Sequence, residues 1–84
     1  MHYTYILWSK KDNQMYTGST NNLKLRLEQH AKGKVESTKS RRPLTLIYYE
    51  ACLVEKDARR REKSLKTYRG KMTLRRRLKS YFTG

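Results

Sequence analysis

Two strand-like segments near the N-terminus most constrain the fold of this chain. Residues 3–9 and 15–19 are rich in aromatic and β-branched side chains, and residues 10–13 (Lys-Lys-Asp-Asn) are turn formers. This pattern predicts a β-hairpin. If its loop holds an even number of residues, odd positions of the first strand share a face with even positions of the second. Tyr5 and Tyr16 would then lie on one face, where their hydroxyls can meet in one site.

The next segments predict a helix, a loop and a third strand. Asn21 or Asn22 can cap a helix that ends at Gly33. Residues 32–42 are polar and lack periodicity, so we interpret them as a mobile basic loop. Residues 44–50 have the β-branched and aromatic composition of a strand.

The C-terminal half predicts two more helices. Apolar residues recur at helical spacing over residues 54–69, and Gly70 is expected to stop this helix at its C′ position. A last helix is marked by Met72, Leu74, Leu78, Tyr81 and Phe82. With no repeat or linker in the sequence, we expect one domain over residues 1–84 in the order β-β-α-β-α-α.

The charge of the chain points to a polyanionic partner. Twenty-one Lys and Arg residues oppose seven Asp and Glu residues, for a net charge of +14. A charge this large opposes folding through self-repulsion, so we favour nucleic acid as the partner over a role in solubility alone. No apolar run approaches the roughly 20 residues of a membrane-spanning helix, so a membrane partner is not expected.

Features that bear on the compartment favour the cytoplasm. The N-terminus lacks a basic leader, a long apolar core and a cleavage site of small residues, so export is not expected. Cys52 is the only cysteine and cannot form an intrachain disulfide, which suits a reducing compartment.

Glu62 is the most informative charged residue, because it stands alone in the cationic run Arg-Arg-Arg-Glu-Lys over residues 59–63. On a helix it lies within about 40° of Ala58 and about 60° of Leu65, so its carboxylate faces inward. A salt bridge to Lys66 at i+4 is one interpretation. We favour a divalent metal or Arg26 across a groove as the compensating cation. One carboxylate suits Mg²⁺ that takes its other ligands from substrate phosphate and water.

Arg26 and His30 belong to the first helix. With Leu23 at zero on a helical wheel, His30 falls at about 340°, inside the apolar stripe, and Arg26 at about 300°, at its edge. Arg26 is either an ordinary surface arginine or a forked donor to a phosphate oxygen. For His30 a satisfied core residue, a phosphate contact and a proton shuttle remain open.

The tyrosines and the basic residues are less specific signals. Seven tyrosines can be core and rim, although a phenol near a metal or an arginine can also move a proton to or from water. The basic side chains of the loop and of the last helix are assigned to backbone phosphates, which supply affinity without sequence readout. The nucleic-acid-binding residues predicted by position are Lys32, Lys34, Lys39, Arg41, Arg42 and Lys66.

Taken in order, these residues resemble the GIY-YIG endonuclease superfamily, and above all its small stand-alone bacterial members. The resemblance is carried by Tyr3-Thr4-Tyr5, Tyr16-Thr17-Gly18-Ser19-Thr20, Leu25-Arg26-Leu27, His30, Arg42-Pro43, residues 46–50, Ala58, Glu62 and Lys66. It covers most of the chain, and the domain is similar to the N-terminal incision module of the excision-repair nuclease. The resemblance implies an α+β fold in which helices flank a three-stranded antiparallel sheet.

The resemblance also implies cleavage assisted by one divalent ion, Mg²⁺ or Mn²⁺, that binds weakly without substrate. By position, Tyr5 and Tyr16 match the tyrosines of the two motifs, and either would deprotonate water. Arg26 would stabilise the phosphorane, His30 matches the histidine one turn later, and Glu62 would hold the metal. Tyr3-Thr4 replaces Gly-Ile, Thr17 replaces Ile, and the late asparagine of many members is absent.

These observations lead to a metal-dependent endonuclease acting on DNA, in repair or recombination, as the first hypothesis. DNA is favoured over RNA, and an unidentified protein partner is left open. The alternative is a non-catalytic nucleic-acid-binding protein that retains the fold. A small basic ribosome-associated protein would explain the charge but not an inward-facing Glu62.

Overall fold

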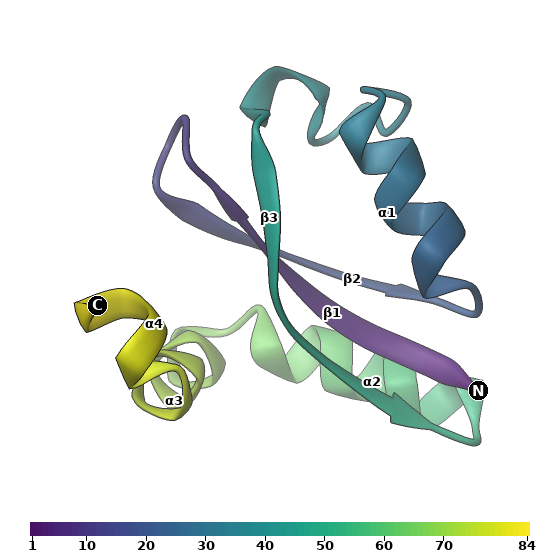
Figure 1. Cartoon of the computed structure of the whole chain (residues 1–84). Coiled ribbons are helices and arrows are strands. Elements are labelled where there is room, and N and C mark those ends of the chain that lie inside the picture. The colour runs from purple at the N-terminus through teal and green to yellow at the C-terminus, as the bar shows by residue number, and fades with distance from the viewer.

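A three-stranded sheet with helices on both faces forms the framework of the protein (Figure 1). The computed structural model describes residues 1–84. The strands are β1 (His2–Ser9), β2 (Gln14–Thr20) and β3 (Leu44–Cys52), in the order β2-β1-β3. Both strand pairs are antiparallel, with β1 in the centre. The predicted α+β fold with an antiparallel sheet is confirmed.

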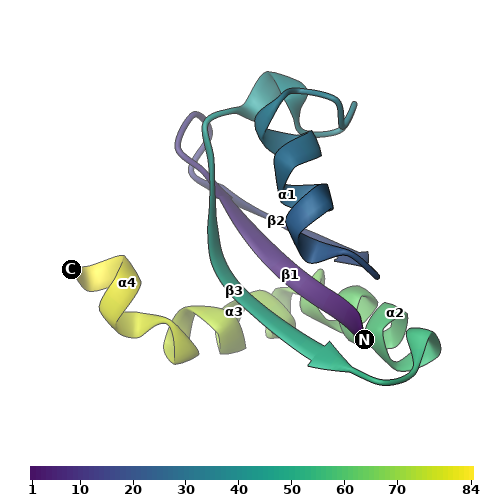
Figure 2. The same ribbon diagram turned by 45° about the vertical axis from the view of Figure 1, so that its right-hand side comes forward.

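Four helices follow the predicted order, and the last expected helix is divided into two. The helices are α1 (Leu23–Ala31), α2 (Glu55–Leu65), α3 (Tyr68–Arg77) and α4 (Lys79–Thr83). The division falls at Leu78, whose backbone (φ −103°, ψ 28°) departs from helical geometry. In both views α3 and α4 lead away from α2, and the C-terminus lies far from the N-terminus (Figure 2). None of the helices combines the length and apolar character needed to cross a membrane.

The alternation of side chains along β1 assigns the two faces of the sheet to different helices. Ile6 points to one face and is fully buried with Met15, Leu65 and Leu74 in the apolar core under α2 and α3. Trp8, Ile47, Tyr48 and Phe82 pack around this core. Tyr5 points to the other face, where α1 places His30 against it. The Tyr5–His30 contact therefore lies on the face of the sheet opposite the main apolar core.

The register of the hairpin confirms the predicted meeting of the two tyrosines. Tyr5 pairs with Gly18 and Leu7 with Tyr16, so the rings of Tyr5 and Tyr16 share a face with centroids 6.5 Å apart. Gly18 is required for this arrangement, because a Cβ atom there would lie 2.5 Å from the Tyr5 Cζ atom. The glycine thus makes room for an aromatic ring across the strand pair.

The predicted boundary of the second helix was wrong. The helix α2 ends at Leu65, and Gly70 lies inside α3, where it is buried. Thr67 begins α3 as its N-cap and accepts a hydrogen bond from the Gly70 N–H (3.1 Å). A Cβ atom at Gly70 would lie 2.6 Å from the Leu65 Cα atom, so the glycine permits close helix packing instead of ending a helix.

The structure replaces the expected mobile basic loop with an anchored segment. Val35 and Thr38 are buried, and Lys39–Arg41 forms a 3₁₀ turn. The Arg41 side chain pairs with Asp12 (2.6 Å), and the Arg42 guanidinium donates to the carbonyl oxygens of Lys39 (3.0 Å) and Ala31 (3.3 Å). Sequence periodicity could not reveal the contacts of Arg41 with Asp12 and of Arg42 with Ala31, because these residues lie 29 and 11 positions apart.

Replacement of Gly70 tests the packing of α3 on α2. Helix propensity alone predicts that Gly70→Ala stabilises the protein by about 1 kcal/mol. We expect instead that the free energy of unfolding in urea falls by about 1–3 kcal/mol, because the methyl group collides with backbone. Lys71→Ala, an exposed change in the same helix, is the control and should leave stability within about 0.5 kcal/mol. A stabilised Gly70→Ala protein would contradict this account.

Candidate active site

A buried hydrogen-bond chain connects β1, α1 and the segment after α1. Tyr5 and His30 are each only 1% exposed, and the Tyr5 hydroxyl lies 2.8 Å from His30 Nε2. His30 Nδ1 lies 2.8 Å from Thr38 Oγ1, and Thr38 donates to the carbonyl oxygen of Val35 (3.5 Å). With the Thr38 proton used in this way, Nδ1 donates to Thr38 and Nε2 accepts from Tyr5.

The environment keeps the first two members of this chain neutral. Burial lowers the pKa of His30 to about 4, and the nearby Arg26 charge acts in the same direction. Burial also raises the pKa of Tyr5, an effect that the Arg26 guanidinium partly offsets. A neutral imidazole that accepts from a neutral phenol is therefore the stable state at pH 7. Of the alternatives considered for His30, this geometry matches a satisfied core histidine.

Tyr16 lies on the same face of the sheet as Tyr5, but its hydroxyl group is accessible. It lies on the edge strand β2 and is half-buried, with its ring centroid 5.3 Å from that of His30. The one hydrogen bond to its hydroxyl is a long one from the exposed Ser37 Oγ (3.5 Å). The ring is therefore held by its neighbours while the hydroxyl stays within reach of a ligand.

Arg26 lies one turn before His30 on α1 and is also half-buried. Its Nη1 atom donates to Gln29 Oε1 (3.1 Å), and its charge acts on the pKa values of both Tyr5 and His30. The ion pairs of the protein do not include Arg26. Its other donors are thus free of carboxylate and can meet a phosphate oxygen.

Glu62 faces inward from α2, as helix geometry predicted, and both carboxylate oxygens have partners. Ser19 Oγ donates to Oε1 (2.9 Å), and Lys66 Nζ lies 3.2 Å from Oε2. The Glu62 side chain is 23% exposed and lines a pocket of about 420 Å³ with Ser19, Arg59, Lys63 and Lys66. The i+4 salt bridge that we weighed is therefore present, accompanied by a hydrogen bond from the sheet.

The five predicted catalytic residues approach the edge strand from two sides. Gly18 lies under the Tyr5 ring, whereas the next residue, Ser19, points to the opposite face and binds Glu62. The structure thus gathers Tyr5, Tyr16, Arg26 and His30 on the α1 face and Glu62 on the α2 face. The two groups are electrostatically connected, because the Glu62 charge contributes to the raised pKa of Tyr5.

The donor set around Glu62 fits a weakly held divalent cation. The protein has no cluster of three or more His, Cys, Asp or Glu side chains that could form a complete metal cage. One carboxylate beside a hydroxyl suits Mg²⁺, which keeps several waters and takes ligands from substrate phosphate. Binding at Oε2 requires Lys66 to move aside.

The predicted phosphate-binding residues differ in how far they are already engaged. Lys39 pairs with Glu36 (3.3 Å) and Lys66 with Glu62 (3.2 Å). Arg41 and Arg42 hold the anchored segment, as described above. Lys32 and Lys34 are exposed and form no ion pair, so they are the most available of the six.

Sequence reasoning missed Ser19 and Thr38. Ser19 was signalled by the hairpin, because its neighbour Gly18 shares the Tyr5 face and alternation then turns Ser19 toward α2. Thr38 carried no signal, since its burial depends on the path of a segment without periodicity.

Comparison with known proteins identifies the family of the chain. The family model described as the GIY-YIG catalytic domain matches residues 1–75. UPF0213 protein SH2523 of Staphylococcus haemolyticus is 44% identical over 68 residues, which cover 80% of this chain and 82% of that protein. A UPF0213 protein of Staphylococcus aureus strain Mu3 is 36% identical over 75 residues, or 88% of this chain and 90% of that protein.

A solved structure is also similar. The solution NMR structure of UPF0213 protein BH0048 from Bacillus halodurans superposes with a TM-score of 0.55 at 37% identity, over 87% of this chain and 80% of that chain. The relatives therefore span nearly the same length as this chain. The chain belongs to the GIY-YIG family, and its domain is of the nuclease type.

Proposed function

We propose that the protein is a divalent-metal-dependent endonuclease that hydrolyses phosphodiester bonds in DNA, in repair or recombination. The observation that carries the proposal is the accessible Tyr16 hydroxyl on an edge strand whose opposite face holds the Glu62 carboxylate. A phosphate bound over this edge would lie between a proton acceptor and a metal ligand. Arg26, which has no carboxylate partner, adds positive charge on the α1 face.

We assign the general base to Tyr16 and a positioning role to Tyr5. The Tyr5 hydroxyl is buried and donates to His30, and its raised pKa disfavours the phenolate that a base requires. The Tyr16 hydroxyl is open to an attacking water. His30 packs edge-on against both rings, at 5.6 Å from Tyr5 and 5.3 Å from Tyr16, and so fixes their relative position.

Arg26 and Glu62 act on the phosphate in this scheme. The forked guanidinium of Arg26 stabilises the charge that develops on the non-bridging oxygens. Glu62 would hold the divalent ion, which when bound would supply positive charge to the reacting phosphate. Ser19 orients the carboxylate by its hydrogen bond to Oε1, and Lys66, which pairs with Oε2, would give way to the ion.

The second candidate function is nucleic-acid binding without catalysis. The observation in its favour is that Lys66 already neutralises Glu62, as expected of a purely structural carboxylate. If the protein is a nuclease, Glu62 is needed for cleavage. If the protein only binds nucleic acid, Glu62 contributes to stability alone.

Replacement of Glu62 separates these functions. We expect Glu62→Gln to lower Mg²⁺- or Mn²⁺-dependent nicking of plasmid or branched DNA by on the order of 10² or more, because the metal loses its protein ligand. Binding to the same DNA in EDTA should change less than about twofold. Glu55→Gln, an exposed change on the same helix, is the control and should nick at the wild-type rate. Equal nicking by Glu62→Gln and Glu55→Gln would refute the catalytic role of Glu62.

The two tyrosines are distinguished by measuring activity and stability together. We expect Tyr16→Phe to lower the nicking rate by about 10²–10⁴-fold and to leave the free energy of unfolding within about 0.5 kcal/mol. Tyr5→Phe should lower that free energy by about 1–3 kcal/mol, because it leaves the buried His30 Nε2 atom without a hydrogen-bond partner. If Tyr5→Phe were stable but inactive and Tyr16→Phe were active, the general base would be Tyr5 and the positioning residue Tyr16.

The neutral state of His30 predicts a pH dependence of stability. Its pKa falls from 6.5 to about 4 on folding, so below pH 6.5 the unfolded state binds a proton that the folded state excludes. Stability is therefore lost as the pH falls, by about 2 kcal/mol between pH 7 and pH 5. Urea unfolding of a His2→Gln protein measures this loss with His30 as the sole remaining histidine. A free energy of unfolding equal at the two pH values would exclude a buried neutral His30.

A further inference from the structure

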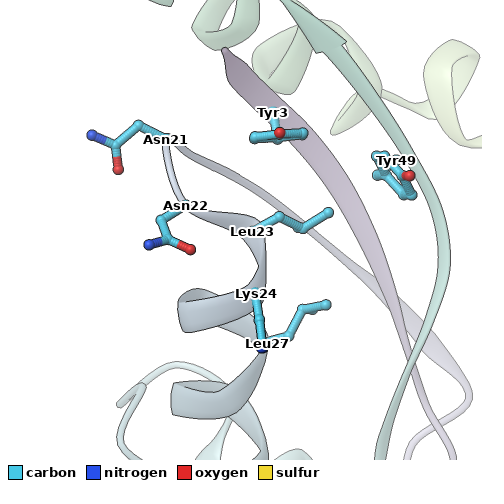
Figure 3. A pocket seen from close by; sticks show the side chains of 7 residues that line it. All are labelled: Tyr3, Asn21, Asn22, Leu23, Lys24, Leu27 and Tyr49. Atoms are coloured by element: carbon cyan, nitrogen blue, oxygen red, sulfur yellow. The ribbon is translucent and has the colours of Figure 1, made fainter.

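A groove on the α1 face is not used by the reaction proposed above. It has a volume of about 460 Å³ and lies between the start of α1 and the strands β1 and β3. Its lining residues are Tyr3, Asn21, Asn22, Leu23, Lys24, Leu27 and Tyr49. Figure 3 shows Leu23 and Leu27 pointing from α1 toward the strands that carry Tyr3 and Tyr49.

The groove offers an aromatic surface to a planar ligand. Tyr49 is 53% exposed, a large fraction for an aromatic side chain in a sheet. Its ring and that of Tyr3 are tilted by 57° with centroids 6.2 Å apart, so they do not stack face to face and cover each other. Leu23 and Leu27 supply apolar contacts across the groove. This combination suits a flat apolar ring system.

The charge of the groove favours an anionic ligand. None of its seven lining residues is acidic, and Lys24 stands among them. The net charge of +14 extends the attraction beyond the groove. A ligand with a planar ring and a neighbouring negative charge matches both properties, and a nucleotide has this chemistry.

The position of the groove connects it to the candidate active site. Tyr49 pairs with Tyr5 across β1 and β3, and Tyr3 precedes Tyr5 by two residues on the same face. Two residues of a strand span about 7 Å. The groove and Tyr5 therefore share the α1 face of the sheet, with the groove on the β3 side of β1 and Tyr16 on the β2 side.

We propose that this groove binds an unpaired nucleobase, which packs on Tyr49 while Lys24 contacts the adjoining phosphate. Base pairs of an intact duplex keep their faces stacked and cannot enter, so the substrate class is single-stranded nucleic acid or a strand that carries an unpaired nucleotide. The inference rests on the proposed nuclease function for its biological meaning. The binding site itself does not depend on catalysis.

Binding of a fluorescently labelled 12-nucleotide oligo-dT in EDTA tests the groove without any cleavage. Stacking of a base on an aromatic ring is worth about 1–3 kcal/mol, so we expect Tyr49→Ala to weaken binding by about tenfold. Tyr49→Phe keeps the ring and should restore the wild-type dissociation constant within about twofold. Tyr68→Ala, which removes a 78% exposed tyrosine from α3, should leave the affinity unchanged.

A second measurement separates base stacking from charge attraction. Wild-type protein should bind oligo-dT several-fold more tightly than an abasic strand of equal length and charge, and Tyr49→Ala should remove this difference. A parallel comparison of oligo-dU with oligo-rU, which differ only in the sugar, shows which sugar the groove accepts. Equal affinity of the wild type for the abasic strand, or an equal loss with Tyr68→Ala, would overturn the proposal. A stacking effect in a protein without metal-dependent nicking would support the groove and refute only the nuclease function.

Discussion

The hydrogen bond between Tyr5 and His30 is the interaction on which the α1 face depends. Both side chains are 1% exposed, and a buried polar group without a partner would destabilise the fold by about 1–3 kcal/mol. The bond fixes α1 against β1, and the second imidazole nitrogen extends the connection to Thr38. One histidine thus determines where three segments of the chain meet, and Tyr16 packs against its ring.

The edge position of β2 explains how so thin a domain can, in the proposed function, offer two sets of side chains to one ligand. A central strand would separate the tyrosines from Glu62, because its neighbours extend the sheet on both sides. The strand β2 has one neighbour only, so Gly18 and Ser19 present opposite faces beside a free edge. The domain needs no deep cleft, since a ligand can straddle that edge.

Local periodicity accounts for what the sequence could predict. The two-residue repeat of the strands brought Tyr5 and Tyr16 together, and the helical repeat turned Glu62 toward Ala58 and Leu65. Both inferences need only the geometry of one element or one hairpin. The prediction that Gly70 ends the second helix was wrong because glycine serves both as a helix terminator and as a site of close packing. Only the contact with Leu65 distinguishes these roles. The pairing of Arg41 with Asp12 could not be predicted from local patterns either, because the two residues are 29 positions apart.

The ion pairs of the protein use only a minority of its Lys and Arg side chains. Asp12, Glu36, Glu50, Glu55, Asp57 and Glu62 each pair with one Lys or Arg, so most of the 21 cations stay unpaired and attract polyanions.

Among these six carboxylates, Glu62 has the least exposed side chain, at 23%, and it also accepts a hydrogen bond from the sheet. Its partner Lys66 is 57% exposed and can turn to solvent at little cost. In the proposed reaction, Lys66 would hold the carboxylate in place in the free protein and release it when a phosphate and its cation bind. A salt bridge at this position is compatible with metal binding because the lysine, unlike the carboxylate, is not fixed.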